Sequence, residues 1–265
     1  MNYIQLDTWD LGLSALLLLG VAALSLVLQL KIEGKLLLAG LRCALQLALV
    51  GLVLTKLFEL VSPLWTGLAA LAMVLFAGRE IMARQERGFR PLWAYGIGTS
   101  AMLMAAATVT VFALTTAVRP EPWYDPRYAL PLLGMIMGNT MTGIALGLQR
   151  LTEGARQQRA GIEALLCLGA TRRKALLPVT RQALTTALMP IINSLAATGL
   201  VSLPGMMTGQ ILAGVDPIDA VKYQLMIMFL IAGGTTLGAV TAVFVGLHRL
   251  TDARDRLRLD RLAGE

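Results

Sequence analysis

The chain alternates long apolar runs with short polar segments that are mostly basic. A helix needs about 20 apolar residues to cross roughly 30 Å of hydrocarbon at 1.5 Å per residue. An outer-membrane barrel would instead show segments of about ten residues that alternate in polarity. The pattern therefore predicts an all-α polytopic membrane protein with seven spanning helices, at about 11–30, 36–55, 64–81, 92–118, 128–148, 184–203 and 221–247.

Composition supports a single permease-like membrane domain over residues 1–265. Hydrophobic residues make up 56% of the chain and charged residues 15%, where about 25% is ordinary. The first apolar run follows a segment with Asp7 and Asp10 but no Lys or Arg. A secretory signal has a basic start, so we expect this run to be a permanent helix.

The positive charges predict the topology. If the N-terminus lies outside, only Lys56, Arg119, Arg127 and Lys222 of the 23 Lys and Arg fall in outside loops. Nearly all the others follow cytoplasmic ends of helices, as the positive-inside rule requires. We therefore expect an outside N-terminus and a cytoplasmic C-terminus. The net charge of +7 then needs no nucleic acid to explain it.

Residues typical of catalysis are scarce. The sequence has no GxxxxGK[ST] phosphate loop, no HExxH, no CxxC and a single His, His248. The predicted helix cores also have no Asp, Glu or His of the kind that relays protons in secondary carriers. We expect no enzyme, no catalytic residue and no cofactor in this chain.

A polar segment over 149–182 is too charged to span and too apolar for a solvated tail, which predicts a short helix on the cytoplasmic face. An amphipathic helix held at the membrane surface by basic residues is the alternative. Its residues resemble the E-A-A-x-x-x-G loop by which permeases of ATP-binding cassette (ABC) importers engage their ATPases, although Pro178 follows sooner than in that loop. The resemblance implies ATPase coupling through Glu163, Ala164, Leu168, Gly169, Ala170, Arg172 and Arg173.

The stretches "ALPLLGMIMGNTMTGIALGLQRL" and "LMPIINSLAATGLVSLPGMMTGQILAGVDPIDAVKYQ" resemble the FetB-type permeases, which are ABC-transporter membrane subunits associated with bacterial iron export and related to plant aluminium-resistance permeases. The resemblance implies a multi-pass homodimer in the bacterial inner membrane with two copies of a separate ATPase, which would bind ATP and Mg. It implies export of iron or another metal. A permease for a nucleotide sugar or other anionic solute, a membrane scaffold and an ATP-independent channel remain alternatives.

Residues 182–215 carry no charge and would measure roughly 50 Å as one helix, longer than the bilayer core. We expect a helix to about Leu203, a break at Pro204 and Gly205, and a short half-helix to Ala213. Irregular backbone at membrane depth occurs beside protein or a water-filled cavity, so the break is a candidate outer gate. An outside loop that rests on the bundle is the alternative.

Several polar or soft side chains are candidates for the substrate pathway: Arg42, Gln46, Asn139, Asn193, Met206, Met207 and Gln210. Arg42 can instead snorkel to the cytoplasmic surface or contact a partner helix. Thioethers bind soft ions such as Cu(I) but also fill gaps in cores. The weak metal candidates are Met135, Met141, Met206 and Met207. Small residues on two helices predict close helix packing at Gly134, Gly138, Gly143, Gly147, Gly234 and Gly238.

Overall fold

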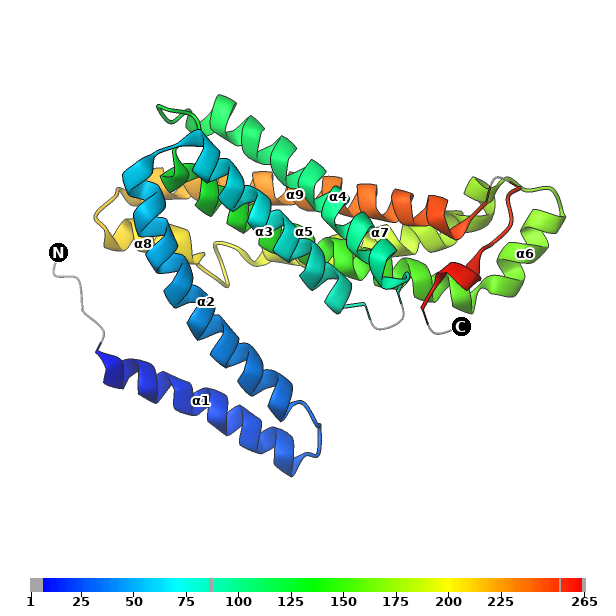
Figure 1. Ribbon diagram of the computed structural model, residues 1–265, viewed down its shortest axis with the longest axis horizontal. Coiled ribbons are helices and arrows are strands. Elements are labelled where there is room, and N and C mark those ends of the chain that lie inside the picture. Colours follow the sequence, from blue (N-terminus) through cyan, green and yellow to red (C-terminus); the bar gives the residue numbers. More distant parts are fainter. Residues whose placement is uncertain (1–6, 86–87, 253, 264–265) are drawn as a thin grey trace. The chain divides into compact units, whose positions relative to one another are not determined.

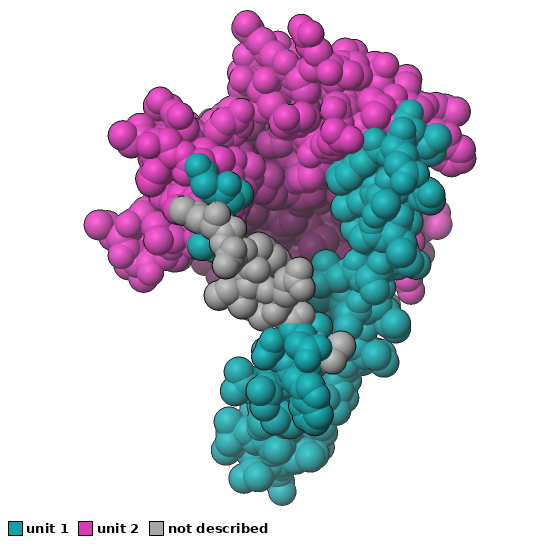
Figure 2. Space-filling model, turned by 90° about the vertical axis from the view of Figure 1, so that its left-hand side faces the viewer, with its two compact units in different colours: residues 1–60, 212–214 teal, residues 61–211, 215–265 magenta. Residues whose placement is uncertain are grey.

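The computed structural model describes residues 7–85, 88–252 and 254–263. The chain divides into two compact units, which Figure 2 distinguishes by colour. One consists of Met1–Leu60 with Leu212–Gly214, and the other of Val61–Ile211 with Val215–Glu265.

The smaller unit is built on a hairpin of α1 (Thr8–Val27) and α2 (Glu33–Leu60). At the turn the Ser25 hydroxyl donates a hydrogen bond of 2.9 Å to Glu33 Oε2. Further along, Gly40 lies so close to Leu18 that a Cβ there would overlap its side chain. Most other apolar side chains of both helices are exposed, as expected of helices that face lipid.

The larger unit is a bundle of long helices with short ones at both ends (Figure 1). At one end of this unit lie α6 and the C-terminal segment, and at the other lie α8 and the loop that connects η1 to α5. Its elements are α3 (Pro63–Ala83), α4 (Pro91–Phe112), the π-helix η1 (Ala113–Val118), α5 (Pro126–Gln157), α6 (Arg159–Cys167), α7 (Arg172–Ala197), α8 (Gly205–Leu212), α9 (Pro217–Leu250) and the 3₁₀ turn η2 (Leu259–Arg261).

The helix α5 is the centre of this bundle, because it contacts α3, α4, α7 and α9. Glycines permit the closest approaches. A Cβ on Gly143 would lie 2.8 Å from Thr235 Cγ2 of α9, and one on Gly147 would lie 3.1 Å from Val243 Cγ2. The predicted packing role is confirmed for Gly143, Gly147, Gly234 and Gly238. It is wrong for Gly138, which is exposed and has nothing within 4 Å of its Cβ position.

Seven helices of the described residues are long and apolar enough to cross a membrane, which confirms the predicted number and the all-helical class. The bounds of two were wrong. The fifth continues to Gln157 instead of ending near 148, and the sixth is Arg172–Ala197 instead of 184–203. Basic residues in the first turns of α7 hid its start, although a helix can extend beyond the hydrocarbon and keep such residues in water. The predicted half-helix is present as α8.

Candidate functional site

One face of α5 is open along almost its whole length, although most of the other side chains between Ala129 and Ala155 are buried. The side chains on it recur every three or four residues, the spacing of a single helix face. Asn139 donates a hydrogen bond only to the Met135 carbonyl one turn earlier, at 3.1 Å. The face is formed by exposed or partly exposed Pro131, Met135, Gly138, Asn139, Thr142, Leu146, Gln149, Arg150 and Glu153.

Polar groups on this face argue against contact with lipid. Uncompensated polar or charged side chains at membrane depth are costly and normally face water or protein. Arg84, which follows α3, also reaches this face, where its Nη1 lies 3.4 Å from Thr142 Oγ1. The open face of α5 is therefore suited to line an aqueous path or an interface with another chain.

A pocket of about 280 Å³, called the α8 pocket below, lies at the end of this face between α5, α8 and α9. Pro131 and Met135 belong to both the face and the pocket. The remaining lining residues are Val118, Arg127, Tyr128, Leu132, Met206, Gln210, Val215, Tyr223, Met226 and Ile227.

The structure brings some of the predicted pathway residues together and separates others. Met206 and Gln210 lie with Met135 in the α8 pocket. Asn193 is exposed on α7, and Met207 is partly exposed on α8 outside the pocket lining. Met141 packs against the core cluster of the bundle instead. Arg42 and Gln46 have exposed side chains on α2, in the smaller unit.

The predicted coupling segment contains the short helix α6, held to the bundle by one apolar edge. Ile162 is buried in the core cluster and Leu166 packs against it. On the outer side Glu163 pairs with Arg159 at 2.9 Å, one turn away. This pairing keeps Glu163 at the surface of α6.

Gly169 ends α6 in a left-handed conformation with φ of +85°. Its N–H donates to the Leu166 carbonyl and that of Ala170 to the Leu165 carbonyl, both at 3.0 Å. This hydrogen-bond pattern is the Schellman cap, which favours glycine at its left-handed position. Nothing lies within 4 Å of where a Cβ would be, so the space beside Gly169 is open.

The surface around this cap is apolar and basic. Leu168 is 84% exposed and Leu165 of the same helix is 42% exposed, so neither side chain is buried within this chain. Ala164 and Arg173 are also exposed, whereas Arg172 pairs with Asp255 of the C-terminal segment at 3.7 Å. The six residues from Ala164 to Gly169 thus present a small apolar surface next to cations.

The C-terminal segment folds back over the same end of the bundle and was missed by the sequence analysis. Leu259 and Leu262 are buried in its core, and the Ala263 carbonyl accepts a hydrogen bond of 2.7 Å from Arg156 Nη2 of α5. The guanidinium of Arg249 lies 3.8 Å from the centre of the Trp93 ring. Alternation of Arg and Leu over 256–259 was the available signal for an extended, half-buried segment.

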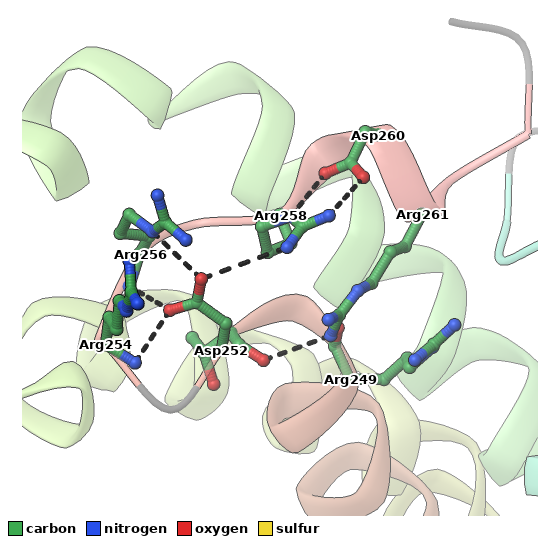
Figure 3. Close-up of polar contacts among 8 residues, drawn as sticks. Arg249, Asp252, Arg254, Arg256, Arg258, Asp260 and Arg261 are labelled. Carbon is green, nitrogen blue, oxygen red and sulfur yellow. Dashed lines mark hydrogen bonds and ion pairs between the residues drawn. The ribbon is translucent and has the colours of Figure 1, made fainter.

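Two aspartates organise this segment (Figure 3). Asp252 accepts hydrogen bonds of 2.9 Å from the backbone N–H groups of Arg256 and Arg254 and from Arg256 Nε. These bonds, led by the Arg256 backbone, lower the pKa of Asp252. Asp260 receives two bonds of 2.8 Å from Arg258, which lower its pKa to about 2.

Among the residues described by the structure, no three His, Cys, Asp or Glu side chains converge as metal ligands. The soft donors are better placed, because Met135, Met206 and Met226 come from three helices to one pocket. Arg127 lines the same pocket, and no carboxylate does. The charge there suits an anion better than a bare cation.

Comparisons with known proteins give the family. Residues 8–251 match the "Uncharacterised protein family (UPF0014)". The chain is 42% identical to "UPF0014 membrane protein slr1647" of Synechocystis sp. over 90% of this chain and 92% of the relative. It is 36% identical to "UPF0014 membrane protein STAR2" of Oryza sativa, over 87% of this chain and 81% of the relative.

A relative from Escherichia coli bears a functional name. "Probable iron export permease protein FetB" is 29% identical over 99% of both chains. No solved structure matches. Length, helical pattern and sequence similarity agree over nearly the whole chain, and the protein therefore belongs to the UPF0014 family of membrane proteins.

Proposed function

We propose that this chain is the permease subunit of an ABC transporter, driven by ATP hydrolysis on a separate ATPase subunit. The observation that carries this proposal is the exposed α6 cap. An apolar, basic surface at the end of a membrane bundle is suited to enter a cleft on an acidic partner. The side chain of Leu168 is 84% exposed and is therefore available for such a contact.

The C-terminal segment supports a role of α6 in transmitting movement. It contacts α5 through Arg156 and the start of α7 through Arg172. It also meets the residues before α4, since Arg90 N–H donates to the Arg261 carbonyl at 3.4 Å. A push on α6 would therefore reach α5 and α7, which α6 contacts directly, and through the C-terminal segment the start of α4.

The orientation follows from charge. The basic residues around α6 and the C-terminal segment lie at one end of the larger unit, and the positive-inside rule assigns that end to the cytoplasm. ATP is cytoplasmic, so the same end is the one that an ATPase can reach. We infer an outside N-terminus and the bacterial inner membrane as the site of action.

The name of the Escherichia coli relative suggests export of iron or another metal. The described residues hold no carboxylate or imidazole cluster for a hard ion such as iron. A chelated or transiently held metal is therefore the form of this substrate that fits best. Transport of a nucleotide sugar or other anionic solute is the second candidate, favoured by Arg127 in the α8 pocket. The open face of α5 would line the path, in a homodimer of this chain with two ATPases.

The test is ATP hydrolysis by a separately purified ABC ATPase subunit from the same genome, with and without the chain in lipid nanodiscs. We expect the chain to stimulate hydrolysis. Gly169→Trp adds bulk where the chain itself has open space, and we expect it to abolish stimulation. Gly169→Ala is the matched control: it imposes a similar left-handed strain of about 1–2 kcal/mol without the bulk, and should keep most of the stimulation.

The outcomes separate the alternatives. Equal loss in both Gly169 variants would assign the effect to the cap geometry and not to docking. Normal stimulation by Gly169→Trp would remove α6 from the coupling surface. No association of the ATPase with the chain would favour a membrane scaffold whose basic segments bind lipid.

A further inference from the structure

The α8 pocket is lined by residues from several helices of the larger unit. It draws on the first three turns of α5, on α8 and on the first turns of α9, together with Val118 at the end of η1 and Val215 before α9. It lies at the opposite end of the larger unit from α6 (Figure 1). It also forms one end of the open face of α5, through Pro131 and Met135.

The charge of the pocket is positive. Arg127 is its charged lining residue, and no Asp or Glu lines it. Within the part of the chain that the structure describes, the Arg127 guanidinium has no hydrogen bond or ion pair, because only its backbone N–H is engaged, by Asp125. The positive end of α5 is already capped by the Asp125 carboxylate, so the attraction for an anion comes from the Arg127 side chain.

The polar groups beside Arg127 are also available. Tyr128 and Tyr223 line the pocket, and their hydroxyls have no hydrogen-bond partner in the described part of the chain. Gln210 Oε1 is fully shielded from solvent and lacks a partner too. A buried acceptor without a donor is destabilising, and such groups are normally satisfied by a ligand, a partner or water. The unpaired acceptor therefore favours a ligand that brings its own donor.

The size of the pocket limits the ligand. Its volume of about 280 Å³ is just below the roughly 300–1,000 Å³ of pockets for drug-sized molecules. A small organic acid fits inside it whole, whereas only part of a nucleotide sugar would enter it.

From these observations we propose that the α8 pocket binds a small organic anion that carries a hydroxyl or amine donor. Arg127 and the two tyrosines hold the anionic group, and Gln210 Oε1 accepts the hydrogen bond of the donor. The same chemistry is present in a free hydroxy acid and in the headgroup of phosphatidylglycerol. The idea that the pocket holds the transported substrate rests on the proposed transport function. The idea that it binds an anion does not.

The test is calorimetric titration of the purified chain, without any ATPase, in nanodiscs of neutral phosphatidylcholine. The probes are citrate and tricarballylate, which has the same three carboxylates but lacks the hydroxyl. We expect citrate to bind, and Arg127→Gln to weaken it about tenfold or more through the loss of one charge-assisted hydrogen bond. Gln210→Leu should weaken citrate and leave tricarballylate unchanged.

The matched control is Arg119→Gln. Arg119 lies in the same loop region, but its Nε is engaged by the Thr116 carbonyl at 2.9 Å and it does not line the pocket. We expect its variant to bind citrate normally. If citrate does not bind, or if both arginine variants lose affinity equally, the anion site is wrong.

A second arm separates the two sources of the ligand. In nanodiscs that contain phosphatidylglycerol, a headgroup in the pocket would weaken citrate binding to the unmodified chain, and Arg127→Gln would remove that competition. Unchanged citrate affinity would assign the pocket to the free anion. Because the ATPase is absent from this titration, a negative result in the ATP hydrolysis experiment does not affect the anion site. A negative titration likewise does not affect the proposed coupling to an ATPase.

Discussion

The tightest contact between α9 and its neighbours involves Gly238, where a substitution should destabilise the bundle. A Cβ on Gly238 would overlap Thr140 Cγ2 of α5 and lie 3.2 Å from Ile144 Cδ1 and 3.4 Å from Ala105 Cβ of α4. The methyl group of a β-branched residue in a helix is held in few rotamers, and the Ala105 methyl cannot turn away. Gly238→Ala must therefore separate α9 from α4 and α5.

The loss of free energy of unfolding in Gly238→Ala can be judged against Gly233→Ala. Gly233 lies on the exposed side of α9 with nothing within 4 Å of its Cβ position. Gly→Ala in a helix interior gains about 0.8–1 kcal/mol of helix propensity at either position. Forcing a methyl group into a packed core costs about 1–3 kcal/mol, and only Gly238 meets that cost. The two variants should therefore differ in free energy of unfolding by about 1–3 kcal/mol.

The assay is reversible unfolding of each variant in mixed micelles with increasing SDS, followed by tryptophan fluorescence. We expect Gly233→Ala to match or exceed the unmodified chain and Gly238→Ala to unfold at lower SDS. Equal stability of the two variants would refute the close packing of α4, α5 and α9 at this level.

Two further predictions concern the C-terminal segment. Trp93→Leu removes the ring that contacts Arg249 and should lower the free energy of unfolding of this end by about 0.5–2 kcal/mol, measured by hydrogen exchange; an unchanged exchange rate would contradict the contact. Hydrogen bonds from Arg258 lower the pKa of Asp260 from 3.8 to about 2, so the stabilisation is complete above about pH 4 and is lost as the pH falls through 2. Limited proteolysis should find the segment equally resistant at pH 7 and pH 5 and cleaved faster near pH 2, and loss of resistance already at pH 5 would contradict the pairing.

Hydrophobic run length was sufficient to predict seven helices, because a spanning helix must satisfy its backbone internally and cover its length with apolar side chains. The break before α8 was also predictable from Pro204 and Gly205. The start of α7 was not, since Arg172 and Arg173 look like loop residues until Asp255, far along the chain, is seen to pair with one of them.

Only part of the candidate site was predictable from the sequence. Asn139, Met206 and Gln210 stand out as polar or soft residues in apolar runs. Arg127 and Tyr223 do not, because each follows a loop where charged and aromatic residues are ordinary. Only the meeting of α5, α8 and α9 places them in one pocket with Gln210.

The central claim is that the chain moves a solute only with ATP hydrolysed by a separate subunit. The most direct measurement is flux of radiolabelled iron, supplied with citrate, across proteoliposomes that hold the chain with or without a separate ATPase subunit from the same genome. We predict flux only when the ATPase and ATP are both present, and none with an ATPase that binds but cannot hydrolyse ATP. Flux through the chain alone would identify a channel and contradict the account.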